Sequence, residues 1–276
     1  MRAAILLLFL SISFPPSASI DRVDSTTRRP CYPGAYYRKV VSDLDHWTGI
    51  TGRVRLPVIE FDKNRVNTNK PGQFLDNPTV YMGGNMDGQE TDIGLTWEVI
   101  KESDGTISKE RKAYRPFFRR NAYGKSKQKF TWISGPPEPQ YYWYPGDVIS
   151  ITVKIIRDGV LKFTVEGEGK KYETEVACDA YIFGRAGEFK RVNAIDQVGN
   201  ENKPVQPTNT KVIKSEWAYT YLLKMENGKE IKRSLNTGRH IEMSCPQIEH
   251  FPLQQHHRLN KKGGESIDIY GRFPIP

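Results

Sequence analysis

The amino-acid sequence predicts an all-β fold, an antiparallel sandwich or barrel, and three observations support this prediction. Apolar and polar residues alternate over many short runs, with the period of a β-strand. Clusters of Gly, Pro, Asn and Asp separate these runs. No window repeats its apolar residues with the period of a helix, so a sheet protein is the only regular fold class that fits.

The first predicted strands occupy the segment up to residue 133. The run 52–62 places Val54, Leu56 and Val58 on one face, and a loop rich in Asn, Pro and Gly follows it. Asp104-Gly105 marks the tip of a hairpin turn. The remaining strands of this part are predicted at 79–84, 91–100, 113–120 and 128–133.

The second half of the chain repeats the pattern. Residues 141–176 are predicted to form three strands, joined by turns at Asp158-Gly159 and at Gly167-Glu168-Gly169. Two further strands are predicted at 189–196 and 211–224, followed by a hairpin turn at Asn227-Gly228.

The chain ends and its compartment are predicted from composition. Residues 1–19 resemble a secretory signal peptide, with Arg2, an apolar run at 3–14, and the small residues Ser17 and Ser19 before the cleavage site; a buried N-terminal helix is the open alternative. No later stretch is long enough for a membrane span, so the mature protein is predicted to be secreted and extracellular. We expect an extended N-terminal arm at 20–45, one β-sandwich domain at 46–245, and a loosely ordered C-terminal tail at 246–276.

Three cysteines allow one disulfide in an oxidising compartment. Spacing leaves all three pairings of Cys31, Cys178 and Cys245 open. We favour Cys178 with Cys245, because Cys31 lies in the predicted arm. The third thiol then stays free or forms dimers.

The formal net charge of +9 favours acidic partners. Because the protein is predicted to be secreted, nucleic acid is not expected, and an anionic glycan or a membrane surface is the better partner. The basic segment 111–129 interleaves aromatic residues with Arg and Lys and is the candidate contact. A solvated face that serves only solubility explains the same charge.

Three predicted strands combine a bulky apolar face with a small, polar one. In 148–156, Ile149 and Ile151 oppose Ser150 and Thr152. In 91–100, Ile93, Leu95, Trp97 and Val99 oppose Asp92, Gly94, Thr96 and Glu98. In 211–224, Trp217, Tyr219 and Tyr221 oppose Glu216, Ala218 and Thr220. Small residues leave room for a groove, so the polar faces are a candidate ligand surface; a sheet with one wet face is the alternative.

Short motifs within 79–223 resemble the glutamic peptidase (eqolisin) family. They are Tyr81-Met82-Gly83, then Tyr144-Pro145 followed by Gly146-Asp147, and finally Ser215-Glu216-Trp217. The resemblance implies a concanavalin A-like jelly roll of two antiparallel sheets. It places Glu216 at the position of the family's catalytic glutamate, the general base that activates a water.

One position departs from the family pattern. Asp92 stands where the family's Gln-X-Gly has its glutamine, and Gln89 lies three residues earlier, on the other face unless a bulge intervenes. Two carboxylates that face one water can share a proton, so Glu216 as base and Asp92 as its partner would form an acid-pH hydrolase of peptides. An ionised Asp92 would repel an oxyanion, which is why acid pH is expected.

Other candidate ligand contacts are Gln89, Thr96 and Thr220 beside the polar faces, and Tyr142 and Trp143, whose rings could stack on sugars or fill the core. The segment 85–92 fails the spacing of a calcium loop, and the scattered cysteines form no zinc pattern, so no metal and no cofactor are expected. Two functions are therefore predicted: a glutamic-peptidase-like hydrolase, or a non-catalytic carbohydrate-binding protein that uses the concave sheet. A structural or interaction protein is a third alternative.

Overall fold

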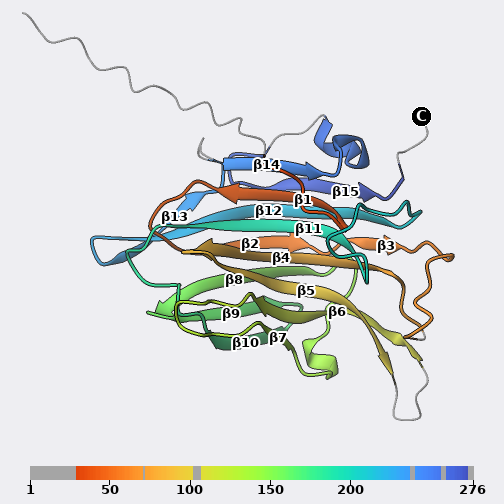
Figure 1. Cartoon of the computed structure of the whole chain (residues 1–276), viewed down its shortest axis with the longest axis horizontal. Helices are drawn as coiled ribbons and strands as arrows, with labels where there is room; N and C mark the ends of the chain where they lie inside the picture. Colours follow the sequence, from red (N-terminus) through yellow and green to blue (C-terminus); the bar gives the residue numbers. More distant parts are fainter. Residues whose placement is uncertain (1–28, 71, 102–106, 237–239, 256–258, 273–276) are drawn as a thin grey trace, which may run out of the picture.

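Two antiparallel β-sheets form the protein (Figure 1). This computed structural model describes residues 29–70, 72–101, 107–236, 240–255 and 259–272, and the predicted signal peptide lies outside them. In spatial order, the first sheet contains β14 (His240–Cys245), β1 (Ala35–Ser42), β11 (Gly187–Gln197), β4 (Asp76–Met86), β5 (Gln89–Lys101), β6 (Ile107–Arg120) and β7 (Thr131–Ser134). The predicted two-sheet antiparallel sandwich is confirmed.

The second sheet contains eight strands among the described residues. Its path is β10 (Lys170–Ala177), β9 (Val160–Gly167), β8 (Val148–Arg157), β2 (Trp47–Arg55), β12 (Lys211–Glu226) and β13 (Lys229–Ser234). Both β3 (Val58–Glu60) and β15 (Glu265–Tyr270) pair with β12. The described helices are single 3-10 turns, namely η1 (Pro139–Tyr141), η2 (Ile248–His250) and η3 (Pro252–Gln255). We call the first the seven-stranded sheet and the second the eight-stranded sheet.

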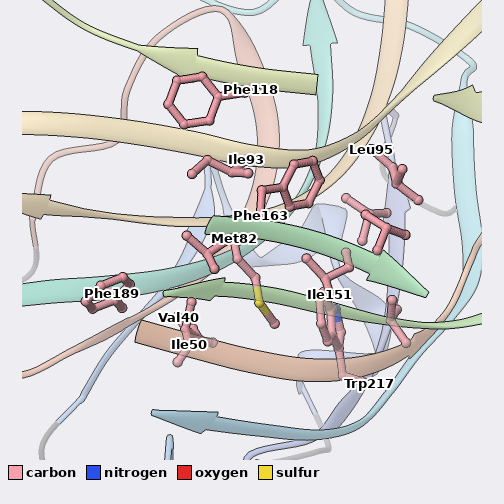
Figure 2. Packing of buried hydrophobic residues seen from close by; sticks show 14 of the residues in the cluster. Val40, Ile50, Met82, Ile93, Leu95, Phe118, Ile151, Phe163, Phe189 and Trp217 are labelled. Atoms are coloured by element: carbon pink, nitrogen blue, oxygen red, sulfur yellow. The ribbon is translucent and has the colours of Figure 1, made fainter. Parts of the chain in front are cut away.

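The core lies between the two sheets and is built from the apolar face of each strand. Ile93 from β5, Ile151 from β8 and Trp217 from β12 are almost completely buried and point into the same layer (Figure 2). Burying a large apolar side chain contributes about 1.5–3 kcal/mol. The polar face of each strand is therefore left on the outside of its sheet.

The ordered sandwich extends beyond the predicted domain boundaries at both ends. Residues 35–42, expected in the arm, form β1 in the interior of the seven-stranded sheet, where Tyr36 and Val40 are buried. Residues 265–270, expected in a loose tail, form β15, and Ile267 is buried against the core. The prediction is corrected, because the residues that cover these short strands come from distant parts of the chain and leave no local signal in 20–45 or 246–276.

Strand β15 also neutralises buried charge. Glu265 is almost fully buried and accepts hydrogen bonds from Arg38 of β1 and from Arg191 of β11. Arg191 also lies over the Trp217 ring, at 5.2 Å from its centroid. Buried charges are tolerated only when they are paired. Glu265 of the C-terminal strand β15 therefore supplies the negative charge that the buried Arg38 of β1 needs.

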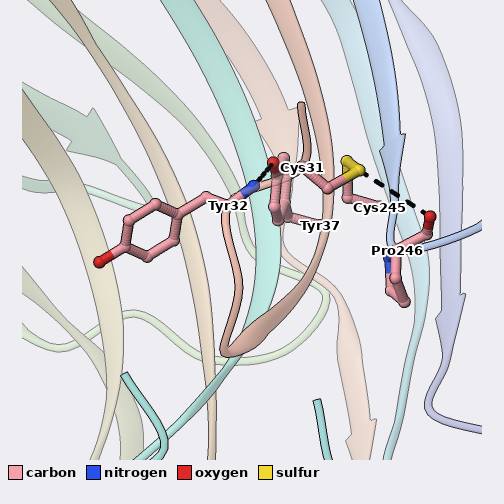
Figure 3. Close-up of a disulfide and its surroundings, with 5 residues drawn as sticks. All are labelled: Cys31, Tyr32, Tyr37, Cys245 and Pro246. Carbon is pink, nitrogen blue, oxygen red and sulfur yellow. Dashed lines mark hydrogen bonds between the residues drawn. A yellow bond between two sulfur atoms is a disulfide. The ribbon is translucent and has the colours of Figure 1, made fainter. Parts of the chain in front are cut away.

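The disulfide joins Cys31 to Cys245, which corrects the favoured pairing of Cys178 with Cys245 (Figure 3). Strands β1 and β14 are neighbours with Tyr37 opposite Cys245, so the segment before β1 passes the end of β14. The two Cα atoms are 5.7 Å apart, inside the usual range for a disulfide. Cys178 follows β10 at the edge of the other sheet, where it is buried and unpaired.

Two irregularities in β12 change which side chains face the core. Lys214 has a positive φ of 64°, and the pairing with β2 shifts between Trp217 and Tyr219. A bulge of this kind inserts one residue and exchanges the faces beyond it. Thr220 is therefore buried, while Tyr219 and Tyr221 stack on each other outside the core, the reverse of the predicted faces.

Candidate functional site

Asp92 and Glu216 do not meet. Asp92 belongs to β5 of the seven-stranded sheet, and Glu216 belongs to β12 of the eight-stranded sheet. Each is flanked by residues that point into the core, so the two carboxylates lie on opposite outer faces of the sandwich. Glu216 is 59% exposed and lies 3.8 Å from Arg55 Nε, in an ordinary surface ion pair. The predicted catalytic pair is corrected, because no single water can contact both groups.

All five predicted ligand contacts are buried. Gln89 lies on the core side of β5, where its Nε2 donates to Gln128 Oε1 and its Oε1 accepts from the Ala180 N–H. Trp143 donates its indole N–H to the Gly167 carbonyl, and Tyr142 and Thr220 are equally covered. These residues form the structure of the sandwich and contact no solvent.

Thr96 does lie on the same outer face as Asp92. It is nearly covered, and its Oγ1 accepts a hydrogen bond of 3.0 Å from Asn77 Nδ2. It is the one predicted ligand contact that borders a cleft, described below.

The basic segment 111–129 is not a single loop. Its first half belongs to β6, and Arg115 and Arg119 are paired with Glu98 and Asp92. In its second half, Lys125 is paired with Asp87. Three cations of the segment thus have partners within the protein, and its contact with an anionic glycan stays a prediction.

The outer face of the seven-stranded sheet carries a cleft of about 340 Å³, which we call the first cleft. Ala194 of β11 lines it with a small side chain, and Gly94 lies on the neighbouring strand β5. A Cβ at Gly94 would lie 2.5 Å from Tyr81 Cα, so only glycine allows β4 and β5 to pack this closely. The principal lining residues are Tyr81, Asp92, Phe117, Arg119, Lys190 and Asp196.

A buried ionic cluster forms one end of the first cleft. Lys190 Nζ lies 2.6 Å from Asp92 Oδ1, and Arg119 Nη1 lies 2.6 Å from Asp92 Oδ2. Burial alone would raise the pKa of Asp92, but the charges and hydrogen bonds of Lys190 and Arg119 hold it below the usual value. Asp92 is therefore a carboxylate at neutral and mildly acidic pH, where it accepts these hydrogen bonds.

Asp196 is a second carboxyl group of this cleft, in a different environment. It is partly buried and accepts a hydrogen bond of 2.9 Å from Thr79 Oγ1. Burial raises its pKa to about 6; Thr79 opposes this rise, and the negative charge of Asp92 adds to it. The two acids thus differ in protonation at mildly acidic pH, an arrangement typical of acid–base sites.

Aromatic rings form the opposite wall. The indole of Trp132 stacks on the Phe117 ring, with centroids 5.0 Å apart and planes 16° apart. Tyr81 contacts Phe117 edge-on at 6.0 Å. Trp132 is 48% exposed, so one face of a supported aromatic ring is open to a ligand.

Apart from Asp92 and Arg119 of the basic segment, the principal residues that line this cleft were missed by sequence reasoning. The positions of Lys190 and Asp196 differ by six within a predicted strand, and an even difference places both side chains on one face. The strand pairing that puts β11 beside β4 is long-range, and the sequence contains no local signal for it. Trp132 was within a predicted strand but was assigned no role.

No helix among the described residues is long and apolar enough to cross a membrane. Within the same part of the chain, no group of three or more His, Cys, Asp or Glu side chains is placed to hold a metal ion.

No protein-family model and no curated protein sequence matches this chain. Among solved structures, a Scytalido-glutamic peptidase bound to a peptide-based transition-state analogue is similar at 13% identity, covering 86% of this chain and 98% of that chain with a TM-score of 0.49. The laminarinase catalytic domain from Thermotoga petrophila matches at 12% identity, over 70% of this chain and 79% of that chain, with a TM-score of 0.38. The family that the sequence motifs resemble is thus also found among the similar structures, and the likeness concerns overall architecture alone.

Proposed function

We propose that this protein is a secreted carbohydrate-binding protein whose ligand, a polysaccharide, lies in the first cleft. The observation that carries the proposal is the half-exposed Trp132 ring, stacked on Phe117 and adjacent to the Asp92–Arg119 pair. An aromatic ring offers an apolar surface to the C–H face of a sugar ring. A carboxylate and a guanidinium beside it offer acceptors and donors for hydroxyl groups.

The charge distribution favours a neutral glycan over an anionic one. Of the three cations that line the first cleft, Lys190 and Arg119 are already paired with Asp92, and Lys190 also contacts Glu90. Burial and the charge of Lys190 lower the pKa of the third, Lys39. An anionic sugar would have to compete with these internal partners, whereas hydroxyl groups can share their remaining hydrogen-bonding positions. Polar groups that are held in place before binding give specificity at a low ordering cost.

The test is a binding titration of neutral oligosaccharides at neutral pH, followed by calorimetry. The Trp132→Ala variant should bind at least about tenfold more weakly, because one aromatic contact is lost. Phe183→Ala is the matched control, since Phe183 is an exposed aromatic ring that does not line the first cleft. Unchanged binding by Trp132→Ala, or an equal loss in the control, would refute the proposal.

A second candidate function is hydrolysis at acid pH. It is favoured by the two carboxyl groups of the first cleft, one held ionised and the other with its pKa raised to about 6. In this alternative a water attacks the scissile bond, the ionised Asp92 takes a proton from that water in place of Glu216, and Asp196 donates a proton to the leaving group. The substrate would be a peptide or a glycan.

The assay for this alternative measures new amino groups from an unfolded protein and new reducing ends from polysaccharides at about pH 5. Asp196→Asn should abolish either activity while the protein stays folded. Glu216→Gln is the control and should retain it. Activity that depends on Glu216 and not on Asp196 would exclude this mechanism.

Export is supported by the basic and apolar pattern of residues 1–19 and by the Cys31–Cys245 disulfide, which is typical of oxidising compartments. Sequencing the N-terminus of the mature protein from its native source tests this point. A first residue near Ile20 is expected, and an intact Met1 would contradict export through cleavage.

A further inference from the structure

A second cleft, of about 420 Å³, lies beside the first on the seven-stranded sheet. It is bounded by the loop before β4, by the outer faces of β5 and β6, and by Trp132 of β7. Trp132 lines both clefts. The two hollows therefore meet at one aromatic ring.

The second cleft is polar and partly preorganised. Arg115 Nη2 lies 3.1 Å from Glu98 Oε1, which orients both groups on the outer face. The Nε donor of Arg115 has no acceptor among the described residues. A buried donor without a partner is unfavourable, and a ligand oxygen that reached it would be bound more strongly.

The spacing along β5 gives the length of the combined groove. Asp92 lines the first cleft, and Glu98 lines the second, six residues further along the same strand. At about 3.3 Å per residue, the two positions are about 20 Å apart. A monosaccharide is too small to reach both, whereas an extended chain of several sugar rings spans them.

We propose that the two clefts are successive subsites of one groove, which binds an extended polysaccharide chain that passes over Trp132. This inference rests on the proposed carbohydrate-binding function and extends the contacts of the polysaccharide from the first cleft into the second. Glu98 and Arg115 hold the part of the chain beyond Trp132, and Asp92 and Arg119 hold the part before it. Affinity therefore depends on chain length.

The experiment measures the dissociation constants of a neutral oligosaccharide series, from disaccharide to hexasaccharide, by calorimetry. For the wild-type protein, the hexasaccharide should bind about tenfold or more tightly than the disaccharide, because it alone reaches the second cleft. Arg115→Gln should remove this advantage and leave disaccharide binding unchanged. Arg157→Gln is the matched control, since Arg157 forms an exposed ion pair with Glu175 on the other sheet.

The outcomes separate this inference from the proposed function. Equal affinities for all chain lengths, or an Arg115→Gln variant that weakens disaccharide and hexasaccharide equally, would overturn the single groove and leave sugar binding intact. Absence of binding at every length would overturn both. Glu98→Gln provides a second variant if Arg115→Gln does not fold, and circular dichroism and thermal unfolding establish folding for each.

Discussion

Lys190 and Asp92 form an ion pair of 2.6 Å across an intervening strand. Lys190 belongs to β11 and Asp92 to β5, and both are opposite Gly83 of β4 in the strand register. Gly83 has no side chain, so the two long-range partners meet over its backbone. A Cβ at this position would also lie only 2.0 Å from the Thr91 carbonyl oxygen. One glycine thus allows the ionic cluster of the first cleft to form.

The Lys190→Met variant should be less stable by about 3–5 kcal/mol, because a buried carboxylate loses its main partner. Lys190 is 7% exposed and Asp92 is 14% exposed, so water compensates little. Urea unfolding at neutral pH measures the change. Lys171→Met is the control: Lys171 pairs with Glu173 on the surface, and its removal should cost less than about 1 kcal/mol. Equal costs for both variants would show that the cluster is not buried in solution.

Asp196 and Asp92 should affect stability with opposite signs as pH changes. The pKa of Asp196 is raised to about 6 in the folded protein, against about 3.9 in the unfolded chain. Its ionisation therefore disfavours the folded state progressively above about pH 4, and Asp196→Asn should be more stable than wild type by about 1–3 kcal/mol at neutral pH. The gain should vanish below about pH 4.

For Asp92 the folded pKa is lowered, so its contribution is present above the unfolded pKa and is lost as pH falls. Asp92→Asn should therefore destabilise the protein at neutral pH and have a smaller effect in acid. Urea midpoints from about pH 3 to pH 8 measure both variants. Parallel pH profiles for Asp92→Asn and Asp196→Asn would contradict the assigned environments.

The thiol that remains outside the disulfide should be unreactive in the native protein. Cys178 is buried, and burial raises the pKa of its thiol to about 12, so almost no thiolate forms at neutral pH. A thiol-reactive dye should detect no thiol in the folded protein and one per chain after unfolding without reductant. A native thiol that reacts at once would indicate a free Cys31. Cys178→Ala should show no signal in either state.

Removal of the disulfide should lower the free energy of unfolding by about 2–5 kcal/mol, because Cys31 and Cys245 close a loop with a sequence separation of 214 residues. The double variant Cys31→Ser with Cys245→Ser tests this by urea unfolding. A reductant should destabilise the wild type and leave this variant unchanged. No difference between the two proteins would mean that the bridge contributes nothing to the sandwich.

Glu216→Gln should leave stability within about 1 kcal/mol of wild type, because its ion pair with Arg55 is exposed. It should also leave ligand binding unchanged, since Glu216 lies on the outer face of the eight-stranded sheet. Urea unfolding and the oligosaccharide titration measure the two effects. Loss of binding in this folded variant would indicate that the functional site lies on the outer face of the eight-stranded sheet.

The sequence by itself determined the fold class and the outward direction of Asp92. Alternation along 91–100 separates Ile93 and Leu95 from Asp92 and Thr96, and the structure retains these faces. This succeeds because side-chain direction in a regular strand depends only on residue parity. The same rule misplaced Thr220, because the bulge in β12 shifts the parity and no local sequence signal marks it.

Only the tertiary structure decided which groups meet. Lys190 and Asp92 are far apart in sequence, as are Cys31 and Cys245, and their contacts follow from strand order and register. Strand pairing is a long-range choice, set by how the whole chain buries its apolar faces. For that reason the sequence identified Asp92 as a polar residue that faces out of its sheet. Its partners Lys190 and Arg119, and its separation from Glu216, were found only in the assembled sandwich.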